Sequence, residues 1–111
     1  MAIKGNNAVT GVLILNTDTT LLNPTTGRAA VTFASLHEQT GAEETIELFI
    51  SSDASSAAGE RIDKIVLAAN ETTQPVSMLL TIPDDFFLIA KATTGSRVEC
   101  NLTFTQYTGN S

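Results

Sequence analysis

The residues that most often carry catalysis are scarce in this chain. Its 111 residues include one histidine, His37, and one cysteine, Cys100. A hydrolase triad needs a base beside its nucleophile, and a zinc site needs several closely spaced nitrogen or sulfur ligands. The sequence has no Gly-x-Ser-x-Gly elbow and no glycine-rich phosphate loop. We therefore expect a protein that is not an enzyme and that uses no cofactor or metal.

The two single residues have simple structural interpretations. His37 ends an apolar segment and precedes Glu38 and Gln39, so we expect a solvated side chain at the end of a strand. Cys100 alternates with polar residues on what should be an apolar face, which favours a small buried hydrophobe over a reactive thiol. A lone cysteine cannot form an internal disulfide, and this is compatible with synthesis in a reducing cytoplasm.

Paired carboxylates occur twice, at Glu43-Glu44 and at Asp84-Asp85. Two carboxylates can act as acid and base or bind calcium, but neighbours on a strand point to opposite faces. We interpret Glu43-Glu44 as the solvated start of a strand. After Pro83, the aspartates are expected to stabilise a turn by accepting hydrogen bonds from backbone amides.

Three aromatic residues could serve recognition: Phe86, Phe87 and Tyr107. Aromatic rings stack on sugars, but aromatics make up only 5% of the chain and tryptophan is absent. Core packing and contact between subunits are therefore favoured, and these three residues are the predicted interface residues.

The elements that carry these residues are predicted to be strands. The clearest pattern places Val98, Cys100, Leu102 and Phe104 on one face of a strand within Arg97–Tyr107. Further strands are expected at 8–15, 29–37, 45–50, 62–68, 76–82 and 86–92, separated by turn-forming segments.

The segment 45–50 allows two interpretations, a helix or a strand. Ile46, Phe49 and Ile50 fit a helical face, whereas Ile46, Leu48 and Ile50 fit a strand; the short length favours the strand. Segments 76–82 and 86–92 flank Pro83-Asp84-Asp85 and are expected to form a hairpin. Seven such strands predict an all-β fold, a single-domain antiparallel β-sandwich or jelly roll.

Charge and composition exclude several classes of partner. The net charge is -6, the sequence pI is about 4.5, and the six basic residues are scattered. An acidic chain without a basic patch disfavours direct binding to nucleic acid. No apolar run approaches 18 residues, so no membrane span is expected, and the run from Val12 to Leu15 is too short for the hydrophobic region of a signal peptide.

A series of phrases from Gly27 to Tyr107 resembles small all-β virion proteins of tailed bacteriophages. The phrases are Gly-Arg-Ala-Ala-Val-Thr-Phe at 27–33, Glu-Leu-Phe-Ile at 47–50, Leu-Ala-Ala-Asn-Glu-Thr at 67–72, Ile-Pro-Asp-Asp-Phe-Phe-Leu-Ile-Ala at 82–90, and the alternating strand 98–104. Where those proteins typically have glycine in the turn after proline, this chain has Asp84.

The resemblance implies a structural subunit of a virion, assembled in the host cytoplasm. It points to a capsid decoration (cement) protein, a homotrimer that binds the major capsid protein, with residues 1–7 as a flexible arm. A head-tail adaptor or tail accessory protein is the alternative. Outside the structural class, a carbohydrate-binding module would need converging aromatic or acidic residues, and a small jelly-roll enzyme would need a metal cluster.

Overall fold

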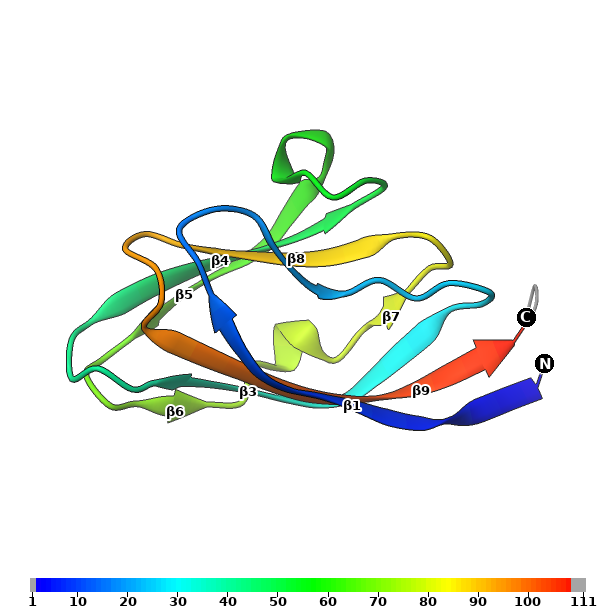
Figure 1. The fold of residues 1–111 in the computed structure, drawn as a ribbon, viewed down its shortest axis with the longest axis horizontal. Coiled ribbons are helices and arrows are strands. Elements are labelled where there is room, and N and C mark those ends of the chain that lie inside the picture. Colours follow the sequence, from blue (N-terminus) through cyan, green and yellow to red (C-terminus); the bar gives the residue numbers. More distant parts are fainter. Residues whose placement is uncertain (1, 109–111) are drawn as a thin grey trace.

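The protein is a sandwich of two antiparallel β-sheets, as the computed structural model shows for residues 2–108, with side chains described from residue 5 onward (Figure 1). The strands are β1 (Ala2–Ile14), β2 (Thr19–Leu22), β3 (Ala29–Glu38), β4 (Glu44–Ser51), β5 (Glu60–Leu67), β6 (Thr72–Thr73), β7 (Thr81–Ile82), β8 (Phe87–Ala92) and β9 (Val98–Thr108). Two short 3₁₀ turns, η1 (Ser56–Ala58) and η2 (Val76–Met78), complete the fold. No helix in this part of the chain is long and apolar enough to cross a membrane.

Strands distant in sequence form each sheet. Sheet A has the order β1-β9-β3-β6, and β7 also pairs with β3. Sheet B has the order β2-β8-β4-β5. Figure 1 shows the two sheets edge-on, with β1 in front and η2 between the layers. The predicted all-β sandwich is confirmed.

The core between the sheets follows the predicted alternation. Val98, Cys100, Leu102 and Phe104 are all buried, and Thr103 faces away from the core. The segment 45–50, for which the sequence allowed a helix or a strand, lies in strand β4 as predicted. Its alternate residues Ile46 and Leu48 are fully buried. The core is completed mainly by aliphatic side chains from both sheets, including Ile14, Leu21, Val31, Leu36, Leu67, Met78, Ile82 and Leu88.

The predicted strand at 76–82 and its hairpin are wrong. Val76–Met78 is the 3₁₀ turn η2, and only Thr81 and Ile82 form a strand, which pairs with β3 rather than β8. Pro75 precedes the turn and has no N–H to donate to a ladder. The 3₁₀ turn places Met78 in the core and leaves Val76 81% exposed. The apolar residues at alternate positions from 76 to 82 therefore do not share one face of a strand.

The first strand is longer than predicted. β1 begins at Ala2, which pairs with Thr108, so residues 2–7 belong to sheet A rather than to a separate arm; Met1 lies outside the described residues. A bulge between Ile3 and Gly5 interrupts the register. The expected start at residue 8 was wrong. Glycine and asparagine in this segment give no alternating hydrophobic pattern, but their backbone groups still pair with β9.

Short strands with few apolar residues were also missed. β2, β6 and the turn η1 have no periodic pattern of their own, and each is positioned by neighbours. The Asn23 side chain donates to the Phe86 carbonyl at 2.7 Å, and the Asp85 amide donates to the Pro24 carbonyl at 2.9 Å. These bonds hold the turn before β8 against the segment after β2, which directs β8 into sheet B.

Candidate interaction surfaces

The three predicted interface aromatics are all half-buried and lie on separate features. Phe86 lies in the turn before β8, and Phe87 is the first residue of that strand. Tyr107, on β9, lies under the Arg28 guanidinium, 4.9 Å from the ring centroid. Their role in a subunit contact stays a prediction.

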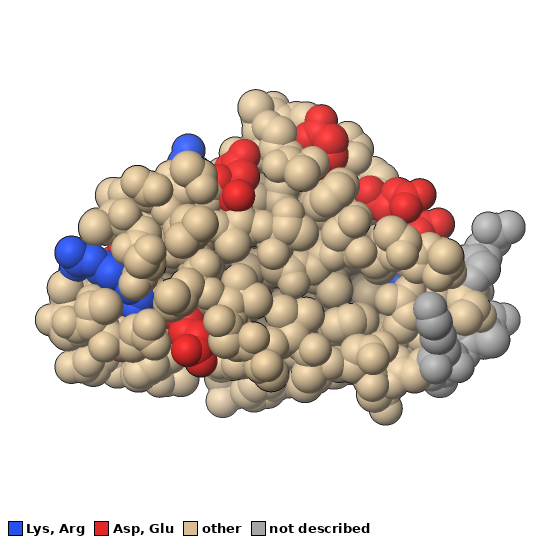
Figure 2. Space-filling view, in the orientation of Figure 1, with Lys and Arg blue, Asp and Glu red and all other residues tan. Residues whose placement is uncertain are grey.

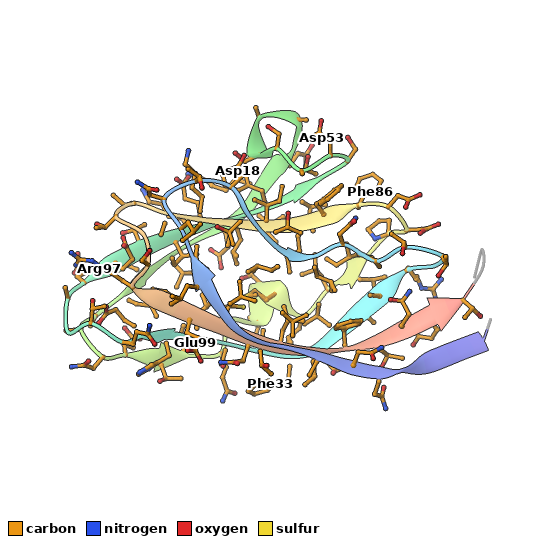
Figure 3. The ribbon with its side chains drawn as sticks, viewed as in Figure 1. Asp18, Phe33, Asp53, Phe86, Arg97 and Glu99 are labelled. Carbon is orange, nitrogen blue, oxygen red and sulfur yellow. The ribbon has the colours of Figure 1, made fainter. Side chains whose placement is uncertain are left out.

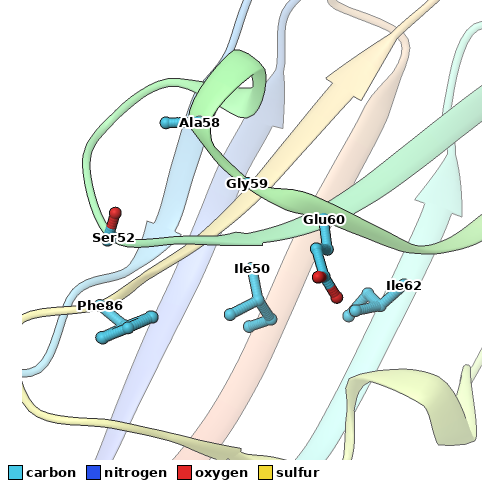
Figure 4. Close-up of a pocket in the computed structure, with 7 residues that line it drawn as sticks. All are labelled: Ile50, Ser52, Ala58, Gly59, Glu60, Ile62 and Phe86. Atoms are coloured by element: carbon cyan, nitrogen blue, oxygen red, sulfur yellow. The ribbon is translucent and has the colours of Figure 1, made fainter.

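Phe86 alone of the three lines a pocket of about 370 Å³ at the open side of the sandwich (Figure 4). Ile50, Ala58 and Ile62 supply the rest of its apolar lining, and the Glu60 side chain lies between Ile50 and Ile62. The sole histidine, His37, does not line this pocket: it is on β3, where its Nδ1 lies 2.7 Å from the Thr72 hydroxyl.

Most of the hydrogen bonds that acidic side chains accept come from backbone amides, whereas Glu47 pairs with Arg61. Within residues 2–108, no three histidine, cysteine or acidic side chains are grouped so that they could hold a metal ion. Asp84 accepts a hydrogen bond from the Gly27 amide at 3.1 Å, so its carboxylate joins the turn after Pro83 to the segment before β3 instead of bonding within the turn as predicted.

Glu38 is the most heavily hydrogen-bonded carboxylate, and the sequence analysis did not single it out. Its side chain is fully buried and accepts hydrogen bonds from the backbone amides of Thr40, Gly41, Ala42 and Asn70 at 2.8–3.1 Å, and from the Thr40 hydroxyl. Burial raises the pKa of this carboxyl, but the hydrogen bonds outweigh it and lower the pKa to about 2. Glu38 thus joins the β3–β4 turn to the β5–β6 turn.

Glu44 joins a second pair of segments at the same end. Its carboxylate accepts hydrogen bonds from the amides of Thr45, Thr94 and Gly95 at 2.9–3.1 Å. Burial opposes ionisation, yet these bonds and the charge of Arg97 leave the pKa of Glu44 below its usual range. The prediction of a solvated pair is wrong for Glu44, which is 2% exposed, and holds for Glu43.

Glu38→Gln should lower the melting temperature at pH 7 by about 5 to 10 °C, since an amide offers one acceptor oxygen to several buried donors. The low pKa means that the ionised carboxylate stabilises the fold above about pH 4.5, and that this contribution is lost as pH falls towards 2. The difference in melting temperature between wild type and variant should therefore become smaller between about pH 4.5 and pH 2. Melting curves from pH 7 to 2 measure it, with exposed Glu43→Gln as control; a difference independent of pH would contradict this role.

Exposed apolar side chains are concentrated in two places. Among the described residues, six large hydrophobic side chains are exposed, and five of them form two groups: Leu13 and Leu15, called here the leucine pair, and Phe33, Val76 and Leu79. The second group lines the β3 groove, a depression of about 220 Å³ formed by Thr32, Phe33, Ala34, Gln74, Pro75, Val76 and Leu79. Figure 3 shows Phe33 on the outer side of sheet A.

No protein-family model and no curated protein matches the chain. Among solved structures, it is similar to a Bacillus endospore appendage chain, from a family described as disulfide-linked pili. The TM-score is 0.60, with 16% sequence identity, over 98% of this chain and 90% of that chain. At this identity the likeness shows a shared all-β fold. It lends no support to the tailed-phage part of the resemblance.

Cys100 does not have the accessible thiol that a disulfide between subunits requires. It is the only cysteine in the sequence, and its side chain is fully buried between the sheets, as predicted. Burial raises the pKa of its thiol to about 12. Because disulfide exchange requires an accessible thiolate, the folded protein cannot link its copies through Cys100 without opening sheet A.

Proposed function

We propose that this protein is a non-enzymatic structural subunit whose copies associate without covalent links into a larger protein assembly. The observation that carries the proposal is the distribution of charge over the edges of the sandwich. Residues 5–27, which include most of β1 and all of β2, contain one charged residue, Asp18. Figure 2 shows this side of the molecule as largely uncharged, with basic groups at its left and most acidic groups towards its margins.

The edge strands differ sharply. β5, at one edge of sheet B, carries four charged residues among eight, Glu60, Arg61, Asp63 and Lys64. Charges of this kind keep an edge strand from pairing with other chains. β1, at the edge of sheet A, has 13 residues and only one charge, Lys4. An edge strand of that length with a single charged residue is typical of a surface covered by another subunit.

The fold likeness to an appendage subunit supports assembly as the use of this sandwich. Burial of Cys100 argues against a disulfide between copies through this residue, which supports association without such a link. Copies with a net charge of -6 repel one another, so raising the salt concentration should strengthen association by screening that repulsion.

Light scattering coupled to size exclusion tests the proposal. We expect particles heavier than one 11.7 kDa subunit, with a mass that rises with protein concentration and salt and is unchanged by a reducing agent. Electron microscopy of the heaviest fraction should show regular particles or fibres. A monomer at every concentration up to the solubility limit, with and without salt, would overturn the proposed function.

The finer proposal is that the assembly is a virion, with this chain as a trimeric capsid decoration protein on the major capsid protein. Its support is the series of phrases between Gly27 and Tyr107. Immunogold labelling of intact particles tests it. Label over the head supports decoration, label at one vertex or on the tail supports the adaptor or tail alternative, and unlabelled particles would end the virion proposal.

A further inference from the structure

We propose that copies of this chain join head to tail, with the leucine pair of one copy inserted into the β3 groove of the next. This inference rests on the proposed function, since it names the contact through which copies associate. It assigns a role to five of the six exposed large hydrophobic side chains in the described part of the chain.

The β3 groove lies at an interruption of sheet A. On the side away from β9, β3 pairs with β7 at Ala29 and Ala30 and with β6 at Leu36 and His37. Between these pairings the Val31 amide donates to the Leu80 carbonyl, and no strand among the described residues pairs with Thr32–Ser35 on this side. The gap is an opening in the sheet edge with an apolar floor and no charged lining residue.

Apolar side chains line this opening and are exposed in a single copy. Val76 is 81% exposed, Leu79 47% and Phe33 41%. η2 holds Val76 and Leu79 rigidly, because the Met78 side chain is fully buried and the Ser77 hydroxyl donates to the Asp63 carboxylate of β5 at 2.6 Å. Apolar side chains that are exposed together on a fixed backbone favour an apolar occupant.

The leucine pair is a suitable occupant. Leu13 and Leu15 flank fully buried Ile14 and are 39% and 45% exposed. The Leu15 backbone is already bonded, through its amide to the Thr19 hydroxyl and through its carbonyl to the Ala92 amide. The two leucines are therefore held on a fixed backbone and are available for contact through their side chains.

A second copy is the occupant because the two surfaces cannot meet within one chain. The leucine pair lies at the β1 edge of sheet A and the groove at the opposite edge of β3, with β9 between them. The groove has no charged lining residue, and the leucine pair has one charged neighbour on the adjacent strand, Glu99 opposite Leu13. The groove therefore adds no second negative charge to this contact, although each copy has a net charge of -6. A basic partner would instead be drawn to the acidic groups, none of which lines the groove.

This contact uses two different surfaces of the chain. When two copies join, one of them still has a free groove and the other a free leucine pair, so further copies can add at both ends. Such a heterologous contact closes into a ring when its rotation allows and otherwise grows into a filament. A ring of three copies would give the predicted trimer, and continued growth would give a fibre. Both assemblies use the same junction.

Paired variants test the junction. The double variant Leu13→Asp/Leu15→Asp removes one half, and Val76→Asp/Leu79→Asp removes the other. Each alone should weaken association by about 100-fold or more, as expected when central apolar contacts of an interface are replaced. Val66→Asp, at the sixth exposed position on β5, is the matched control and should associate like wild type. Unchanged melting temperatures confirm that each variant folds.

Mixing gives the decisive result. An equimolar mixture of the two double variants should form a dimer of twice the subunit mass and no larger species, because each variant contributes one intact half. A mixture that stays monomeric would overturn the head-to-tail contact, as would either variant assembling like wild type. If wild type itself never associates, the proposed function fails; if wild type associates and both variants do too, only this junction fails.

Discussion

Phe104→Ala should lower the free energy of unfolding by about 3 to 5 kcal/mol, the cost of removing a buried aromatic ring and leaving a cavity. The Phe104 side chain is 9% exposed and belongs to the core. Its strand, β9, lies between β1 and β3, with Asn7 and Val31 opposite Phe104. Because both neighbouring strands are fixed by pairing with β9, the cavity cannot collapse easily.

Urea unfolding followed by circular dichroism measures this loss. The control is Thr103→Ala, the preceding residue, which points away from the core and bonds the Thr32 hydroxyl at 2.9 Å. Its expected cost is below about 1 kcal/mol. Equal costs at the two positions would contradict the assignment of faces on β9.

Alternation of side chains explains why β9 and β4 could be predicted. When one face is buried and the other exposed, a period of two appears in the sequence, as in Val98 to Phe104. The same apolar spacing at 76–82 was misleading, because the 3₁₀ turn η2 buries Met78 and the separate short strand β7 buries Ile82. To distinguish a continuous strand from a turn followed by a short strand, one must know that only two residues of β3 pair with β7. That pairing is a property of the assembled sheet.

The buried carboxylates could not be predicted for a related reason. Nothing in the sequence near Glu38 marks it as buried, since one of its donors, Asn70, is 32 residues away in the sequence. Glu44 likewise meets Thr94 and Gly95 from another turn. Adjacent acidic residues such as Glu43 and Glu44 have the same local signal and opposite environments, and only the packing of distant loops separates them.

The interaction surfaces depend on topology in the same way. Phe33 and Val76 are ordinary strand-forming hydrophobic residues in the sequence, and both were assigned to strands. Their exposure follows from the gap between β6 and β7, which leaves part of β3 uncovered. The predicted aromatics were chosen by residue type alone, whereas exposure in the folded chain points to the leucine pair and the β3 groove.

Gly27→Ala is expected to destabilise the protein by about 3 kcal/mol or more, through steric conflict with the backbone rather than loss of a contact. Gly27 has a φ of +141°, which L side chains rarely adopt, and an added Cβ would lie 2.0 Å from the Tyr107 carbonyl oxygen. The residue cannot move away easily. Its amide donates to Asp84, and its carbonyl accepts from the Gln106 side chain.

Gly41→Ala separates the two causes of this cost. Gly41 also has a positive φ, +78°, but the nearest atom to an added Cβ is the Asn70 side-chain nitrogen at 3.9 Å, an ordinary contact. Its replacement should therefore carry only the conformational cost, about 1 to 2 kcal/mol. Urea unfolding of both variants measures the difference, which reports the close approach of the segment before β3 to the end of β9. If the two variants lose equal stability, Gly27 does not contact the Tyr107 carbonyl, and the last residues of β9 pack against the chain differently.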